Sequence, residues 1–190
     1  WYVLNIISIN EKYKYKINIS YPVTKYLDIN KKIYNIINDI RNEFVKVSKR
    51  NIIMNVYFTL YIKYEEYSYD DITSYIFSVS SFTGGAHPNN YLRSIRFLKN
   101  KLITINTLLS YDKNILSKMC AYSRSQFLSR DDFKDKEIIQ MMIEGTSEKT
   151  ENYSNFAITN NGILVFFDYY QVAPYYYGVQ KVLIPYNKLL

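Results

Sequence analysis

The residues most suited to chemistry surround the chain's single histidine, in the stretch SFTGGAHPNN at positions 81–90. Imidazole changes its charge near neutral pH, so His87 is a candidate general base or ligand contact. Gly84 and Gly85 allow positive φ, and Pro88 biases His87 towards an extended conformation. The same pattern is typical of a strand-to-strand turn braced by the histidine. We expect this bracing role, with ligand contact and catalysis as alternatives.

A catalytic His87 would need an acid as its partner. A hydrolase would pair it with a carboxylate such as Asp168, within hydrogen-bond reach. Two carboxylates that converge in space would also suit glycoside hydrolysis. Further acids stand near an expected strand turn: Glu65, Glu66, Asp70 and Asp71. For the adjacent pair at 70–71, a solvated turn is a simpler interpretation than a cation site.

The chain lacks the motifs of common enzyme and cofactor classes. It contains no GxSxG elbow and no GxGxxG or GxxxxGK[ST] phosphate loop. One Cys and one His exclude an internal disulfide and a Cys/His zinc site. Cys120 stands in a helical pattern, which indicates a buried apolar role. We expect neither a cofactor nor a metal ion.

Tyrosine is unusually frequent in this sequence. The chain has 22 Tyr and 10 Phe, and aromatic residues make up 17% of it. Its richness in Asn, Ile and Lys favours an AT-rich coding sequence as the general cause. The functional alternative is a set of tyrosine faces for a sugar ring or a protein partner.

The densest tyrosine cluster is DYYQVAPYYYG, residues 168–178. Pro174 fixes its own φ, and Gly178 permits a reversal of the chain. The three consecutive tyrosines between them cannot all point inward, so at least one must be exposed. Tyr176 and Tyr177 are the better binding candidates, because an exposed tyrosine on a loop held by a sheet suits a sugar or a partner.

Three further residues of this loop have two interpretations each. Tyr170 and Tyr175 are candidate binding residues, and they would equally serve as plugs at the edge of the core. Asp168 is a candidate binding residue that would also accept hydrogen bonds from backbone NH groups of the loop.

The charge balance favours anionic surroundings. Lys and Arg number 24 against 17 Asp and Glu, which gives a net charge of +7. The lysines are scattered, and no helix-turn-helix, zinc-finger or RNP pattern is present, so we expect no nucleic-acid partner.

Apolar periodicity predicts the secondary structure. Strands are expected at about residues 2–9, 12–20, 51–66, 72–82, 91–98, 101–104, 155–159, 163–167 and 179–184. Helices are expected from Asn30, as N-cap, to about 47, and again up to about 128. Tyr21-Pro22 should end the second strand. Residues 137–143 fit either a helix or a strand, and residues 146–151 read as a mobile polar loop.

These elements define an α+β protein, with antiparallel sheets and two main helices packed against them. We expect two closely associated halves, residues 1–90 and 91–190. No apolar stretch reaches the roughly 18–20 residues of a membrane span. Residue 1 is Trp rather than Met, so the native chain is expected to begin earlier, with a signal peptide or a membrane anchor as candidates.

Two stretches resemble a bacterial extracytoplasmic family of undefined activity. They are TGGAHP at 83–88 and GILVFFDYYQVAPYYYGVQKVLIPYNKLL at 162–190. The family includes the ectodomains of RsiV-type anti-sigma factors, which are lysozyme receptors. It also includes the region that precedes the catalytic domain of a peptidoglycan deacetylase. The resemblance spans nearly the whole chain.

What the resemblance implies is an extracytoplasmic, membrane-anchored or lipoprotein domain that binds a cell-wall glycan or a wall-directed protein such as lysozyme. These 190 residues hold no sigma-binding segment or deacetylase domain, so those activities do not transfer. The net charge disfavours a strongly basic lysozyme as the ligand. The alternatives are a wall-modifying hydrolase that uses His87 and a structural accessory domain without a ligand.

Overall fold

The structure is a computed structural model that describes residues 2–50 and 56–190. Its helices and strands form an α+β fold, as the sequence predicts, with four α-helices and two sheets. The larger sheet has the strand order β1-β2-β3-β4-β5-β6, and the smaller one has the order β7-β8-β9. The chain divides into two compact units, residues 1–65 with 77–93 and residues 66–76 with 94–190.

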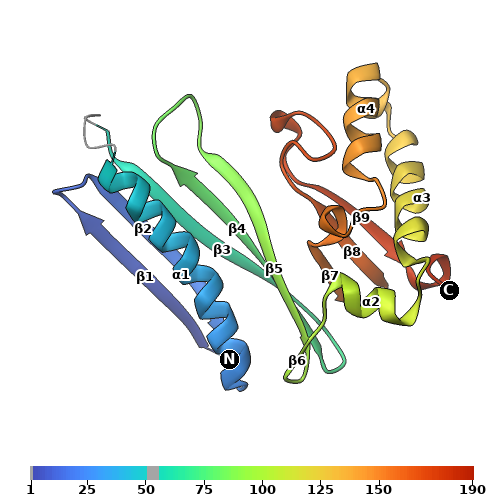
Figure 1. The fold of residues 1–190 in the computed structure, drawn as a ribbon, viewed down its shortest axis with the longest axis horizontal. Helices are drawn as coiled ribbons and strands as arrows, with labels where there is room; N and C mark the ends of the chain where they lie inside the picture. Colours follow the sequence, from blue (N-terminus) through green and yellow to red (C-terminus); the bar gives the residue numbers. More distant parts are fainter. Residues whose placement is uncertain (1, 51–55) are drawn as a thin grey trace. The chain divides into compact units, whose positions relative to one another are not determined.

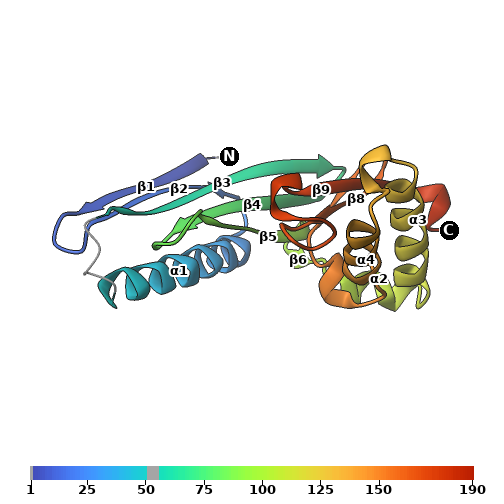
Figure 2. The same cartoon turned by 90° about the horizontal axis from the view of Figure 1, so that it is seen from above.

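In the first unit one helix packs on the strands that flank it in sequence. The strands β1 (Tyr2–Asn10) and β2 (Tyr15–Val23) pair antiparallel, and β2 pairs parallel to β3 (Phe58–Tyr69). The helix α1 (Leu27–Arg50) is the crossover between the parallel pair and lies on one face of these strands (Figures 1 and 2). Its buried residues are Ile29, Ile33, Ile37, Phe44 and Ser48.

Alternating side chains of β2 form the other half of this core. Tyr15, Ile17, Ile19 and Tyr21 are buried, as period-two alternation predicts. The ring of Tyr15 meets the ring of Phe44 edge-on at 5.9 Å between centroids, which joins the strand to the helix.

Four boundary predictions in this unit are wrong. The second strand begins at Tyr15 rather than at about residue 12. Pro22 lies inside β2, where it is tolerated because the pairing of β2 with β3 runs only from Tyr15 to Ile19. The helix begins at Leu27, because Asn30 is not its cap: the Asn30 side chain bonds the backbone N and O of Thr24 at 2.7 and 2.8 Å. The third strand begins at Phe58, and the expected strand residues 51–55 lie outside the described part.

The remaining strands of the larger sheet follow the predictions closely. They are β4 (Ile72–Phe82), β5 (Asn89–Leu98) and the short β6 (Lys101–Leu102), which pairs antiparallel with β5. The side chains of Phe58, Leu60 and Ile62 on β3 are buried, as their alternation predicts.

The second unit packs helices against a small antiparallel sheet. The strands are β7 (Phe156–Thr159), β8 (Gly162–Phe167) and β9 (Gln180–Pro185). The helices are α2 (Ile105–Tyr111), α3 (Ile115–Leu128) and α4 (Lys136–Gly145). They lie on one face of this sheet (Figure 2). Aromatic residues fill the core between the two layers: Phe127 stacks on Phe133 at 4.8 Å and meets Phe167 edge-on at 5.3 Å.

The structure resolves one ambiguity in this unit and corrects one prediction. The ambiguous residues 137–143 are helical, and Asp135 caps the helix by accepting from the backbone N–H groups of Glu137 and Ile138. The stretch 146–151, expected to be mobile, is firmly bonded. Thr146 is fully buried, its hydroxyl donates to the Met142 carbonyl, and its own carbonyl accepts from the Tyr153 hydroxyl.

No helix in residues 2–50 and 56–190 combines the length and the apolar character that a membrane crossing requires.

Candidate functional site

The loop at residues 168–178 is fixed to the second unit by one glutamine. The side-chain oxygen of Gln171 accepts from the backbone N–H of Asp168 at 2.9 Å. The side-chain nitrogen of Gln171 donates to the carbonyls of Gly145 and Asn152, both at 2.9 Å. The Asp168 carboxylate accepts from the backbone N–H of Tyr169 at 2.8 Å. Asp168 therefore organises the loop through a backbone N–H group, which is the structural role considered for it.

Close packing against the end of α4 holds the same loop. A Cβ placed on Gly145 would lie 1.8 Å from the carbonyl oxygen of Gln171, so only glycine allows this approach. Val172 and Ala173, the next two residues, are buried in the core. The loop is thus anchored at its centre, and its two ends carry the tyrosines.

The loop carries five tyrosines, two exposed and three half-buried, which we together call the tyrosine platform: Tyr169, Tyr170, Tyr175, Tyr176 and Tyr177. The ring of Tyr175 lies 5.2 Å from that of Tyr169 and 5.4 Å from that of Tyr170. The rings of Tyr176 and Tyr177 are 4.9 Å apart. Tyr170 is 56% exposed and Tyr176 is 79% exposed, so both side chains are accessible to a ligand.

Tyr177 makes more contacts with the rest of the protein than the sequence predicts for a binding residue. Its hydroxyl donates to the carbonyl of Asp132 at 2.8 Å, and its ring meets Phe133 edge-on. Desolvation, with smaller contributions from Tyr176 and Asp132, raises the pKa of Tyr177. Of the two favoured candidates, Tyr176 is the exposed one and Tyr177 is its support.

A charged pair lies beneath this support. Arg130 binds both carboxylate oxygens of Asp132, at 3.0 and 2.6 Å, and donates to the side chain of Gln180 at 2.7 Å. Gln180 in turn donates to the carbonyl of Tyr177. The hydrogen bonds from Arg130 lower the pKa of Asp132. The platform is therefore tied to the charged loop that precedes α4.

The other end of the loop turns as its proline and glycine require. Pro174 has a φ of −57°, and Gly178 has a φ of 64°, in the left-handed region where no side chain blocks it.

Tyr170, near the first end of the loop, is also left-handed, with a φ of 60°, which non-glycine residues rarely adopt. A strained non-glycine residue in an exposed loop is a feature found at binding sites.

His87 lies on an exposed turn of the first unit. Gly84 and Gly85 have φ values of 97° and 110°, and Nδ1 of His87 lies 2.9 Å from the carbonyl oxygen of Pro88. This contact is of the kind that braces a turn. Asp168 belongs to the second unit, so its pairing with His87 stays a prediction.

The remaining chemical candidates have structural contacts. Asp71 forms an ion pair with Lys99 at 3.2 Å, and Glu66 accepts from the hydroxyl of Ser68 at 3.1 Å. Cys120 is buried, and burial raises the pKa of its thiol, which makes it a poor nucleophile. Within the described ranges, no group of three or more His, Cys, Asp or Glu side chains is arranged to hold a metal ion.

Sequence reasoning missed the residues that hold the platform in place. Gln171, Gly145 and the Arg130–Asp132 pair carry no motif, and their partners are distant in sequence. The only available signal was weak: Gln171 is a lone amide in a tyrosine-rich loop, and Gly145 follows a helical pattern where a C-terminal glycine is common.

The comparisons with known proteins agree with the predicted resemblance. Residues 102–187 match the family described as "Protein of unknown function (DUF3298)". The chain is 30% identical over 111 residues to "Peptidoglycan-N-acetylmuramic acid deacetylase PdaC" of Bacillus subtilis (strain 168). That match covers 57% of this chain and 23% of the deacetylase. The predicted resemblance to part of a peptidoglycan deacetylase is confirmed, whereas the anti-sigma factor resemblance stays a prediction.

Solved structures share the fold over almost the whole chain. A DUF3298 family protein from Pseudomonas aeruginosa PAO1 superposes with a TM-score of 0.73 at 13% identity, covering 98% of this chain and 91% of that one. A DUF3298 family member from Bacteroides fragilis NCTC 9343 gives a TM-score of 0.56 at 15% identity, covering 98% and 89%. At such low identity these likenesses establish the fold alone.

Proposed function

We propose that this chain is a non-enzymatic recognition domain of the bacterial cell envelope, outside the cytoplasm, that binds a cell-wall glycan through the tyrosine platform. The observation that carries the proposal is the anchored loop with two exposed tyrosines, Tyr170 and Tyr176, at its ends. The matched relative is named for its action on peptidoglycan, which supports a wall-directed ligand.

The platform has the physical properties of a sugar-binding surface. The CH face of a pyranose ring packs on an aromatic face, and the phenolic hydroxyl bonds the sugar's hydroxyl groups. Gln171 and the close approach at Gly145 fix the loop before any ligand arrives. A preorganised loop loses little conformational entropy on binding, which favours affinity.

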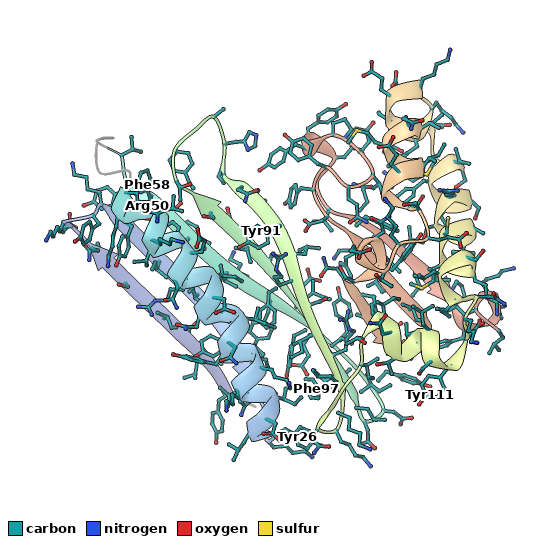
Figure 3. The ribbon with its side chains drawn as sticks, viewed as in Figure 1. Tyr26, Arg50, Phe58, Tyr91, Phe97 and Tyr111 are labelled. Carbon is teal, nitrogen blue, oxygen red and sulfur yellow. The ribbon has the colours of Figure 1, made fainter. Side chains whose placement is uncertain are left out.

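Calorimetry with soluble peptidoglycan fragments tests the proposal. We expect saturable binding by the wild-type domain and a loss of at least about tenfold in affinity for the Tyr170→Ala/Tyr176→Ala double variant, because two stacking faces are removed. The matched control is Tyr111→Ala. Tyr111 lies at the C-terminal end of α2, is 87% exposed and belongs to no part of the platform (Figure 3).

Two further measurements distinguish the proposed function from its alternatives. Lysozyme is titrated in parallel, and saturable lysozyme binding without fragment binding would replace the glycan by a wall-directed protein as the ligand. His87→Ala should leave fragment binding unchanged. Slow cleavage of the fragments that depends on His87 would instead support a wall-modifying hydrolase, and no heat with any ligand would support a structural accessory domain.

A further inference from the structure

A groove in the second unit lies at the turn that joins β7 to β8. It is a cavity of about 410 Å³ between that turn and the end of β3, and its residues all belong to this one unit. Glu66 and Ser68 line one wall, and Asn160 and Asn161 line the other. None of these residues belongs to the tyrosine platform.

The floor of the groove is apolar and fixed. Leu164 on β8 and Leu183 on β9 lie on the sheet face opposite the helices, and both remain partly exposed. Tyr67 and Thr159 also line the groove, and the ring of Tyr67 meets the buried ring of Phe166 edge-on at 5.7 Å. Exposed leucines at the base of a polar groove provide a surface for the CH face of a ligand.

The polar walls hold unused hydrogen-bonding groups. Within the described residues, the side-chain amides of Asn160 and Asn161 bond to no protein group, and each offers two donors and one acceptor. The Glu66 carboxylate accepts from Ser68 through Oε1, which leaves Oε2 available. Two amides and a carboxylate around an apolar floor match a ligand with hydroxyl groups at its edge and CH groups on its face.

We propose that this groove binds a neutral N-acetylhexosamine residue. Neighbouring hydroxyls of the pyranose ring would bond Glu66 and one asparagine, and the acetamido group would bond the other asparagine amide. The apolar face of the ring would lie on Leu164 and Leu183. This inference rests on the proposal that the chain recognises a wall glycan, and it names a second contact separate from the platform.

The Glu66 charge gives the groove a preference between the two sugars of peptidoglycan. N-Acetylmuramic acid carries a carboxylate on its lactyl ether, and a second negative charge beside Glu66 is unfavourable. On the same sheet face, the Lys181 ammonium is held over the Phe166 ring at 5.0 Å and does not line the groove. The groove should therefore favour N-acetylglucosamine over N-acetylmuramic acid.

The test is an NMR titration of the ¹⁵N-labelled domain with the β-1,4-linked trimer of N-acetylglucosamine. Saturable shifts at the amides of Asn160 and Asn161 are expected, with a dissociation constant on the order of 1 mM. Asn160→Ala/Asn161→Ala should weaken binding about tenfold, since two hydrogen bonds are lost. Neither residue has a positive φ, so alanine fits this backbone.

The control variants isolate the groove from the fold and from the platform. Asn100→Ala, in the exposed turn between β5 and β6, should bind like wild type. Glu66→Gln should narrow the difference in affinity between N-acetylglucosamine and N-acetylmuramic acid, because the negative charge that disfavours the lactyl carboxylate is removed. Tyr170→Ala/Tyr176→Ala should keep the trimer shifts at Asn160 and Asn161.

The outcomes distinguish this inference from the proposed function. Absence of shifts at Asn160 and Asn161, or an equal loss in Asn100→Ala, overturns the groove even if the platform still binds peptidoglycan. Trimer shifts in the groove, together with binding of peptidoglycan fragments that is unchanged in Tyr170→Ala/Tyr176→Ala, support the groove and overturn the platform as the proposed site.

Discussion

At the scale of single residues, Arg96 is a buried cation surrounded by backbone carbonyls. Its guanidinium donates to the carbonyls of Ile103, Ser154 and Phe156 at 3.2, 2.8 and 3.0 Å. It also stacks on the Phe156 ring at 3.8 Å, and burial lowers the pKa of Arg96 to about 10. The planar fork of arginine ties β5 to the start of β7, and a single ammonium group does not reproduce this geometry.

Arg96→Lys should therefore lower the free energy of unfolding by roughly 2–4 kcal/mol, because buried carbonyls lose their donors. Chemical denaturation measures the effect. Arg93→Lys is the matched control: Arg93 is exposed, and its replacement should change stability by no more than about 0.5 kcal/mol. Equal midpoints for the two variants would contradict the role given to Arg96.

Asp132 connects a single ion pair to the pH dependence of stability. Arg130 holds the pKa of Asp132 below its ordinary value of 3.8. A carboxylate with a lowered pKa in the folded state stabilises the protein above its unfolded pKa, and this stabilisation is lost as the pH falls through the folded pKa.

Asp132→Asn should accordingly destabilise the domain at neutral pH, and the difference from wild type should shrink below about pH 4. Urea midpoints measured from pH 7 to pH 2 provide the comparison. Asp131→Asn, at the adjacent exposed acid outside this ion pair, should follow the wild-type curve. A constant gap across the whole range would show that the ion pair is not its source.

At the scale of elements, the close packing of α4 against the tyrosine loop depends on glycine at position 145. Gly145→Ala would place a methyl group 1.8 Å from the Gln171 carbonyl oxygen, so the loop must move. We expect a loss of more than about 2 kcal/mol in stability and weaker binding of peptidoglycan fragments. Thermal unfolding and near-UV circular dichroism of the tyrosines report the two effects.

Gly178→Ala serves as the comparison for that prediction. Gly178 has open space around its Cβ position, so alanine there suffers only the left-handed φ of 64°. The expected cost is about 1–2 kcal/mol, because a φ of 64° with a ψ of −161° is a conformation that glycine adopts far more readily than alanine. If Gly145→Ala proves no more harmful than Gly178→Ala, the close approach of the loop is not what holds it.

The sequence periodicity predicted which segments form helices and strands, whereas the residues at which these elements begin and end were predicted less accurately. The strand Ile72–Phe82 and the end of α3 at Leu128 have the predicted bounds. The start of α1 was misplaced because Asn30, a good capping residue by type, brackets Thr24 instead. The helical state of Lys136–Gly145 stayed open because seven apolar-rich residues fit both periods.

The candidate site was only partly predictable for the same reason. The exposed tyrosine between Pro174 and Gly178 follows from local sterics, which a sequence displays. Gln171, Gly145 and Asp132 act through partners 19 to 45 residues away, and no local pattern reveals such contacts.

At the scale of the whole molecule, each of the two compact units is built from two separate segments of the sequence. Residues 66–76, early in the chain, belong with the C-terminal unit. Within it, Tyr67 packs on Phe166, and the hydroxyl of Ser74 accepts from the backbone N–H of Ile158, 84 residues away. The second unit therefore combines the stretch matched by the family, residues 102–187, with a hairpin tip from outside it.

Sedimentation with purified peptidoglycan sacculi tests the central claim most directly. The account predicts that the wild-type domain and Tyr111→Ala sediment with the sacculi, and that Tyr170→Ala/Tyr176→Ala sediments much less while unfolding at the wild-type temperature. Equal sedimentation of all three proteins, or of none, would contradict the claim that the tyrosine platform recognises a wall glycan.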